Sequence, residues 1–150
     1  MQKEIQATAI SYQKRAVLIT GPAGVGKTTL ALRLIEHGAI LIGDDVVNIF
    51  IKNNRLYCKS QEKLKGIIEL RELGLVGGLK VAQAAPVLCM IRLHQNPMER
   101  LPRPKTISLL SKKIPVFDFY ACNATEIRVL YTLRVLLGKN KLEEGITCIN

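Results

Sequence analysis

The segment GPAGVGKT, residues 21–28, constrains the fold more than any other part of this sequence. It satisfies the pattern G-x-x-x-x-G-K-[ST] of a phosphate-binding loop, or P-loop. It follows the near-continuous apolar run RAVLIT, residues 15–20, which is typical of a buried strand. Residues 27–37 then place good helix formers at apolar positions and favour a helix, with Gly38 where the glycine after a helix belongs. A strand, a glycine-rich loop and a helix in this order predict an α/β domain built around a P-loop.

The residue types of the P-loop suit the phosphates of a nucleotide. Glycines in the loop allow backbone conformations that other residues avoid, so that successive N–H groups can point at phosphate oxygens. Lys27 supplies a cation for the outer phosphates, and the hydroxyl of Thr28 is a hard oxygen ligand for Mg²⁺. The predicted phosphate-binding residues are Gly21, Pro22, Ala23, Gly24, Val25, Gly26, Lys27 and Thr28.

Two adjacent carboxylates, Asp44 and Asp45, follow the next predicted strand, residues 39–42. Strand ends beside a P-loop face the bound phosphates in open α/β sheets. A carboxylate there can hold Mg²⁺ or accept the proton of an attacking hydroxyl group. Because neighbouring side chains on an extended chain point to opposite sides, we expect only one of the two to face the phosphates. An acidic surface turn is the alternative, and the nearby P-loop favours a functional role.

Composition limits the class of protein. The chain has 150 residues, 48% of them hydrophobic, which suits a single α/β domain over residues 1–150. No apolar run reaches the roughly 20 residues that a membrane-spanning helix requires, and we expect no signal peptide. Four scattered cysteines without a C-x-x-C pair indicate free thiols in a reducing cytoplasm, and two histidines in unrelated contexts form no metal site. The cysteines are Cys58, Cys89, Cys122 and Cys148.

The formal net charge of +10 points to an acidic or phosphorylated partner. Basic residues are densest in residues 100–113, which contain no acid. We rank a nucleic acid below such a partner because the segment lacks interleaved aromatic residues and any nucleic-acid-binding motif. A solvated basic surface is the simpler alternative.

The remaining pattern predicts mostly strands. One strand is expected over residues 4–12, a hairpin over 46–59 with its turn at Asn53 and Asn54, and strands over 66–73, 85–93 and 115–121. Residues 102–115, punctuated by prolines, are expected to hold one short helix. Apolar residues in helical register predict a last helix within residues 124–139.

Two families of P-loop proteins place an acid after the first helix and second strand. Small-metabolite kinases of the shikimate-kinase type do so, but their chain then turns helical, whereas residues 46–59 predict a hairpin. The second family fits better. Residues 17–47, the segment IIELRELGL at 67–75 and MERLP at 98–102 together resemble the P-loop core, the signature segment and the arginine segment of HPr kinase/phosphorylase. The resemblance is to the short form, which consists of the C-terminal catalytic domain alone.

This resemblance implies a fold, a reaction and roles for residues. The fold is a mixed sheet of the HPr kinase C-terminal domain and PEP carboxykinase type. The reaction is Mg²⁺-dependent transfer of phosphate from ATP to a serine of the phosphocarrier protein HPr, or of an HPr-like carrier of a nitrogen-type phosphotransferase system. The resemblance also implies a cytoplasmic homo-oligomer, often a hexamer.

In the family the catalytic positions match Lys27, Asp45 as the base and Arg100, and the metal ligands match Thr28 and Glu69. From the residues alone, Glu69 and Arg71 would be strand-surface charges and Arg100 one of many basic residues.

The sequence departs from the family pattern in four places. Gln6 stands where the family has a histidine, and a glutamine does not titrate near neutral pH. Glu72 replaces the first glycine of the signature, which adds strain if that position requires a positive φ. An Ala-Pro pair before the signature and a Pro-Gly-Arg segment linked to dephosphorylation are both missing. These departures predict weakened or absent phosphorylase activity, and they keep open a non-catalytic nucleotide-binding regulator and, as a third reading, a small-metabolite kinase.

Overall fold

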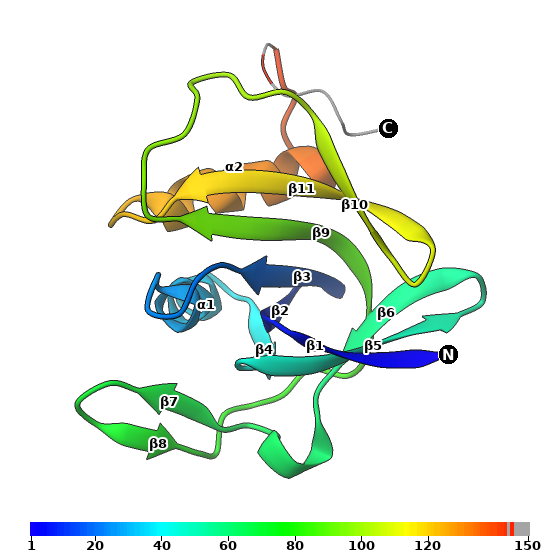
Figure 1. The fold of residues 1–150 in the computed structure, drawn as a ribbon, viewed down its shortest axis with the longest axis vertical. Coiled ribbons are helices and arrows are strands. Elements are labelled where there is room, and N and C mark those ends of the chain that lie inside the picture. Colours follow the sequence, from blue (N-terminus) through cyan, green and yellow to red (C-terminus); the bar gives the residue numbers. More distant parts are fainter. Residues whose placement is uncertain (144, 146–150) are drawn as a thin grey trace.

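The computed structural model of the chain describes residues 1–143 and 145. Nine strands form one large sheet, and a short hairpin projects from it beside the first helix (Figure 1). The strands of the large sheet are β1 (Gln2–Gln6), β2 (Thr8–Tyr12), β3 (Arg15–Thr20), β4 (Ile40–Gly43), β5 (Val46–Lys52), β6 (Arg55–Lys59), β9 (Ala85–His94), β10 (Lys105–Leu109) and β11 (Lys112–Tyr120). The hairpin pairs β7 (Ile68–Leu70) with β8 (Gly74–Val76), and the helices are α1 (Lys27–Glu36), the 3₁₀ helix η1 (Glu62–Leu64) and α2 (Thr125–Leu136).

The sheet topology places the carboxyl ends of three parallel strands together, along the edge of the sheet where those strands end. The sheet runs in the order β1-β5-β6-β9-β3-β2-β4, and β11 pairs with both β9 and β10. Strands β3, β9 and β11 are parallel to one another, whereas the other pairings are antiparallel. The carboxyl ends of the three parallel strands therefore lie on the same side, which is the left-hand side of Figure 1.

Alternate residues of the central strands pack on opposite faces of the sheet. Val17 and Ile19 join the buried cluster under α1 and α2, together with Leu34. Ala16 and Leu18 join a second cluster on the other face, where β5 contributes Val47 and Ile49. Both faces of β3 are thus buried, which explains the near-continuous apolar run before the P-loop.

Several predicted elements are confirmed. The hairpin of β5 and β6 turns at Asn53 and Asn54, whose φ angles of 50° and 61° are those of a tight hairpin turn. Helix α1 ends before Gly38, which has the positive φ of 98° expected just after a helix. Helix α2 lies within the predicted range of residues 124–139.

The predicted short helix within residues 102–115 is wrong. The segment forms strand β10 and the start of β11, joined by a turn at Leu110 and Ser111 with φ angles of 48° and 65°. Along β10 the exposed Thr106 and Ser108 alternate with half-buried apolar residues. This period of two, with a β-branched residue at its centre, favours a strand over a helix.

Other strand predictions need adjustment. The strand predicted over residues 4–12 is divided at Ala7, because β1 pairs with β5 whereas β2 pairs with β3 and β4. The strand predicted over residues 66–73 is reduced to β7, Ile68–Leu70.

The cysteines differ in exposure. Cys58 and Cys89 are buried and Cys122 is exposed, while Cys148 lies outside the described residues. Among the described residues, no helix is both long and apolar enough to cross a bilayer.

Replacing Leu34 by alanine should destabilise the protein strongly. Leu34 is fully buried between α1 and the sheet, so the truncation removes packing and leaves a cavity. We expect the free energy of unfolding to fall by about 2–5 kcal/mol. Ile127→Ala is the matched control, because Ile127 is 47% exposed on α2. Urea denaturation of both variants checks this, and equal losses would contradict the assigned core.

Candidate active site

The P-loop connects β3 to α1 at the edge where the parallel strands end (Figure 1). Gly21 has a φ of 150°, and a Cβ atom there would lie 2.8 Å from the carbonyl oxygen of Leu93. Gly26 has a φ of 111°, and its carbonyl oxygen accepts the first helical hydrogen bond from Leu30 at 2.9 Å. Only glycine fits these two positions without strain, so the loop can turn its N–H groups toward an anion at the start of the helix.

Lys27 lies over this loop. Its ammonium nitrogen donates hydrogen bonds to the carbonyl oxygens of Gly21 at 2.8 Å and Pro22 at 3.3 Å. These contacts hold the cation at the mouth of the loop, where it can meet phosphate oxygens.

Asp44 is the carboxylate that faces the P-loop helix. Its Oδ1 atom accepts hydrogen bonds from the hydroxyl groups of Thr28 at 2.8 Å and Thr8 at 3.0 Å. Its Oδ2 atom accepts one from the backbone N–H of Glu69 at 3.3 Å. The carboxylate and the Thr28 hydroxyl together offer hard oxygen ligands of the kind that Mg²⁺ prefers.

Asp45 occupies a different position from its neighbour. Its side chain is exposed, and its φ of 69° is left-handed, which turns the chain sharply between β4 and β5. Its backbone is fixed, because its N–H donates to the hydroxyl of Thr8 at 3.4 Å and its carbonyl oxygen accepts from Ala7 at 3.0 Å. Its carboxylate accepts no hydrogen bond from the described residues. The two aspartates thus differ in surroundings.

The β7–β8 hairpin carries the signature segment to this site. Glu69 is exposed on β7, and its backbone N–H binds the same carboxylate, that of Asp44, as the Thr28 hydroxyl does. Arg71 reaches the P-loop, since a Cβ atom on Gly24 would lie 3.0 Å from its guanidinium. Glu72 has a φ of 69°, so the position where the family has glycine does have a left-handed backbone.

Arg71 is a candidate functional residue that reasoning from the residue pattern missed. A single exposed arginine carries no signal by itself. Strand periodicity gave no clue either, because β7 ends at Leu70 and Arg71 is the first residue of the hairpin turn.

Two predicted positions lack contacts with this centre. Arg100 is exposed in the segment 95–104 between β9 and β10, and no hydrogen bond joins it to the described residues. Gln6 is exposed at the end of β1, one residue before the Ala7 that binds the backbone of Asp45.

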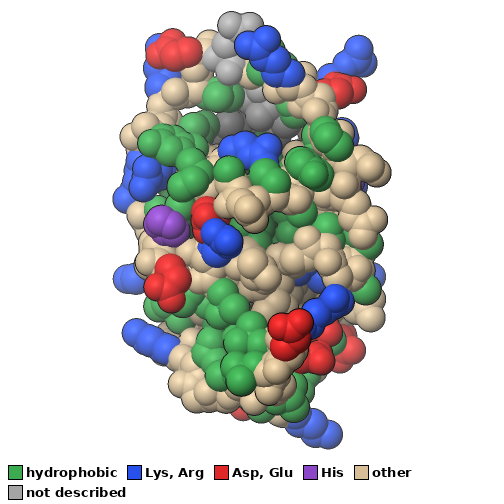
Figure 2. Space-filling model, turned by 90° about the vertical axis from the view of Figure 1, so that its left-hand side faces the viewer, with side chains coloured by type: hydrophobic (Ala, Val, Ile, Leu, Met, Phe, Trp, Pro, Cys, Tyr) green, Lys and Arg blue, Asp and Glu red, His purple; other side chains and the backbone are tan. Residues whose placement is uncertain are grey.

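Figure 2 views this edge face on. Acidic and basic side chains are scattered over this face, side chains of other types and backbone occupy much of its middle, and one group of hydrophobic side chains lies in its lower half. Leu73 and Leu75 of that hairpin are 73% and 76% exposed.

A cavity of about 190 Å³ is lined by Val25 and Gly26 of the P-loop and not by Asp44. It lies between α1 and the first turn of α2, and Arg33 of α1 forms an ion pair of 2.9 Å with Glu126 of α2. Its wall includes the exposed thiol of Cys122. The lining residues are Val25, Gly26, Thr29, Leu30, Arg33, Leu93, Ala121, Cys122, Asn123, Thr125 and Glu126.

Cys122 is a more acidic thiol than usual. Its pKa is lowered by hydrogen bonds from the backbone of Ala124 and the hydroxyl of Thr125, and the guanidinium of Arg128, 3.1 Å from the sulfur, acts in the same direction. A larger thiolate fraction makes an exposed cysteine more reactive toward alkylating reagents.

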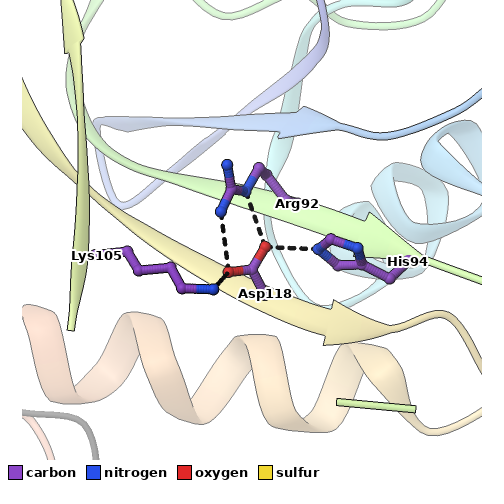
Figure 3. A network of polar contacts seen from close by, with 4 residues as sticks. All are labelled: Arg92, His94, Lys105 and Asp118. Atoms are coloured by element: carbon purple, nitrogen blue, oxygen red, sulfur yellow. Dashed lines mark hydrogen bonds and ion pairs between the residues drawn. The ribbon is translucent and has the colours of Figure 1, made fainter. Parts of the chain in front are cut away.

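A second polar cluster joins β9, β10 and β11, the strands beside β3 on the side away from β2 (Figure 3). The carboxylate of Asp118 on β11 is 2% exposed and receives a bidentate pair of bonds from Arg92, at 2.8 and 3.1 Å. His94 and Lys105 bind the same carboxylate at 2.6 and 3.0 Å. Burial alone would raise the pKa of Asp118, but the bonds from these three groups outweigh it and lower the pKa well below its usual range. Sequence reasoning missed this cluster.

Comparison with known proteins identifies the family. Residues 1–103 match the family model described as the HPr serine kinase C-terminal domain. The chain belongs to this family. The HPr kinase/phosphorylase of Mycoplasma pneumoniae is 36% identical over 83 residues, which cover 51% of this chain and 27% of that protein. The HPr kinase/phosphorylase of Mycoplasma genitalium is 42% identical over 60 residues, 40% of this chain and 19% of that protein.

A solved structure of the family supports the same assignment. The HPr(Ser) kinase/phosphatase from Coxiella burnetii matches with a TM-score of 0.80 and 26% identity, covering 91% of this chain and 97% of that chain. The predicted P-loop mixed sheet of the HPr kinase C-terminal domain is confirmed by this match. The chain spans about a quarter of the length of the curated relatives, 27% and 28% of the first two.

Asp118→Asn should destabilise the protein at neutral pH but less so in acid. Because the folded pKa of Asp118 lies below its ordinary value of 3.8, the ionised carboxylate contributes stability above about pH 4. That contribution is lost as the pH falls through the folded pKa. We expect the free energy of unfolding at pH 7 to drop by about 2 kcal/mol or more.

Urea denaturation from pH 7 to pH 3 checks this prediction. The difference in free energy of unfolding between wild type and variant should narrow below about pH 4. Glu99→Gln is the control, since Glu99 is exposed and has no partner among the described residues. A gap that stays constant with pH would contradict the assigned role of the carboxylate.

Proposed function

We propose that this protein transfers phosphate from ATP to a serine of HPr, or of an HPr-like phosphocarrier protein, in a Mg²⁺-dependent reaction. One observation carries the proposal: Lys27, the Thr28–Asp44 pair and the exposed carboxylate of Asp45 lie on one edge of the sheet, around a P-loop. Family membership supports the reaction class, and the names of the relatives support HPr as the acceptor.

The P-loop and the neighbouring cavity together suit a nucleoside triphosphate. The loop offers N–H groups and the Lys27 cation to the phosphates. The cavity begins at Val25 and Gly26 and is walled by apolar and polar side chains, which suits a base and part of a sugar. Its volume of about 190 Å³ is below that of a pocket that encloses a whole small ligand, roughly 300 Å³ or more, as expected if the phosphates lie outside it.

Thr28, Asp44 and Glu69 are the residues that would hold Mg²⁺. Their oxygens are hard ligands, and the hydrogen bonds to Asp44 bring all three residues together. When bound, Mg²⁺ would neutralise phosphate charge that the P-loop and Lys27 leave uncompensated.

Asp45 is the proposed base. The serine hydroxyl oxygen forms a bond to the γ-phosphorus, the bond from that phosphorus to the β,γ-bridging oxygen breaks, and ADP leaves. The hydroxyl proton passes to the carboxylate of Asp45, which is exposed and free to meet a protein serine. Arg71, which reaches the P-loop, and Arg100, in the segment that leaves the sheet beside it, would stabilise the charge on the transferring group.

The reverse reaction is the weaker part of the proposed activity. Gln6 sits beside the backbone of Asp45 but does not titrate, so it cannot replace a histidine in acid–base chemistry. A regulator that binds nucleotide without transferring phosphate is the alternative, and Gln6 and Glu72 favour it. A cytoplasmic homo-oligomer, hexameric as in much of the family, is part of the same proposal.

Asp45→Asn should stop transfer while sparing nucleotide binding. We expect serine phosphorylation of the cognate HPr-like protein to fall by about 10²–10⁴-fold, because the hydroxyl proton loses its acceptor. The Kd for ATP should change by less than about threefold, since the lost group does not bind the nucleotide. Mass spectrometry of the carrier with Mg-ATP measures transfer, and titration calorimetry measures binding.

Two variants serve as controls. Lys27→Ala should abolish both binding and transfer. Asp44→Asn should weaken Mg²⁺-dependent binding as well, because it removes the negative charge and replaces one acceptor oxygen by an NH2 group, which cannot bind a cation or accept from an N–H. Retained transfer in Asp45→Asn would exclude Asp45 as the base, and wild-type protein that binds ATP but phosphorylates no tested carrier would favour the regulator.

ATP should slow the alkylation of Cys122. The thiol lies in the wall of the cavity, so a nucleoside there would cover it, whereas tripolyphosphate would occupy the P-loop and leave the thiol open. Peptide mapping after iodoacetamide treatment, with and without each ligand, measures the rate at Cys122 itself. Lys27→Ala is the control and should lose the protection. If ATP and tripolyphosphate slowed the alkylation of Cys122 equally, or if bound ATP did not slow it, the nucleoside would not lie in this cavity.

A further inference from the structure

The Asp118 cluster joins the two ends of one exposed segment. His94 is the last residue of β9 and Lys105 is the first residue of β10, and the segment 95–104 lies between them. Both residues bind the carboxylate of Asp118, His94 at Oδ1 and Lys105 at Oδ2 (Figure 3). A single buried carboxylate thus ties the start and the end of the segment to β11.

The segment has few other attachments. Residues 95–104 form no hydrogen bond or ion pair with other described residues, and they contain no helix or strand. The backbone of His94 is fixed separately, since its carbonyl oxygen accepts a hydrogen bond from Ala121 at 2.9 Å. The backbones of the two end residues are held by strand pairing, His94 opposite Tyr120 and Lys105 opposite Val116. The bonds to Asp118 are the side-chain contacts that tie these same two ends to β11.

The cluster is close to the P-loop. Arg92 is the direct partner of Thr20 in the pairing of β9 with β3, and Thr20 is the residue before Gly21. The carbonyl oxygen of Leu93 is the atom that a side chain at Gly21 would strike. The segment that starts after His94 therefore leaves the sheet beside the phosphate-binding loop, on the same edge as Lys27.

The electrostatics make Asp118 a strong anchor. Its carboxylate is almost completely buried, whereas the side chains of Arg92, His94 and Lys105 are 38%, 38% and 46% exposed. Buried carboxylates are stable only when paired and hydrogen-bonded, so Asp118 holds its donors in place. Arg92 alone satisfies Asp118 with two bonds, and the bonds to His94 and Lys105 are additional to that structural pair.

We propose that Asp118 is a positioning residue: through His94 and Lys105 it anchors both ends of the segment 95–104 and so holds Arg100 at the edge that carries the P-loop. The anchoring follows from the contacts alone. Only its consequence for phosphate transfer rests on the proposed function, through the role of Arg100. The simpler alternative is an ion pair of Asp118 and Arg92 that stabilises the pairing of β9 with β11.

Limited proteolysis of Lys105→Met tests the anchoring directly. This variant keeps the Asp118–Arg92 pair, and therefore the sheet, while it releases one end of the segment. Trypsin cleaves after Arg100 when the segment opens, and Arg103 is followed by proline, which trypsin resists. We expect cleavage after Arg100 to accelerate by about five- to tenfold, as the loss of one charge-assisted hydrogen bond would allow. Asp118→Asn should accelerate it at least as much.

Lys113→Met is the matched control. Lys113 lies on the same hairpin and is exposed, and it has no side-chain partner among the described residues. Its replacement removes the same charge and one trypsin site, as Lys105→Met does, but should leave cleavage after Arg100 unchanged. Lys105→Arg should restore the wild-type rate, because an arginine can still reach the carboxylate.

Kinetics then test the consequence for transfer. Lys105→Met should lower kcat for carrier phosphorylation and leave the KM for ATP unchanged, and Lys105→Arg should recover kcat. Wild-type cleavage rates in both Lys105→Met and Asp118→Asn would overturn the proposal in favour of the simple ion pair. Faster cleavage with an unchanged kcat would refute the link to Arg100. Because proteolysis requires no kinase activity, an inactive wild-type protein would contradict the proposed function and not the anchoring.

Discussion

The carboxylate of Asp44 is the contact on which the arrangement of the site depends. It accepts hydrogen bonds from Thr8 on β2, Thr28 on α1 and the backbone of Glu69 on β7. Three segments far apart in the sequence meet at one group, so the P-loop, the acidic turn and the signature hairpin have a fixed mutual position. Charge-assisted bonds of this kind are stronger than neutral ones, which suits a role in alignment.

The sequence was most informative where local chemistry determines structure. The P-loop, α1 with Gly38, and the hairpin turning at Asn53 and Asn54 were predicted, because glycine, asparagine and apolar periodicity specify backbone conformation over short distances. The helix predicted within residues 102–115 is wrong, because the alternation along β10 is short and the three prolines of the segment obscured it. The P-loop thus fixed the fold class, while weaker patterns left individual strands undecided.

The functional contacts that sequence reasoning missed are long-range. Arg71 gains its place over the P-loop only when the β7–β8 hairpin folds beside α1. Asp118 and Arg92 are 26 positions apart and meet because β9 and β11 pair in parallel. No periodicity in one sequence predicts such a register. The same limit applies to the pair Asp44 and Asp45, whose different surroundings depend on the left-handed turn at Asp45.

The cavity between α1 and α2 is lined by Val25 and Gly26 of the P-loop, whereas Asp44 of the acidic turn contacts Thr28, which does not line the cavity. In the proposed reaction, the donor nucleotide and the acceptor protein would therefore approach the transferring phosphate from different directions. Neither needs to leave before the other arrives, so both substrates can be bound at once and the phosphate can pass directly between them. That geometry corresponds to a sequential kinetic mechanism in either order of binding, with no phosphorylated enzyme between two half-reactions.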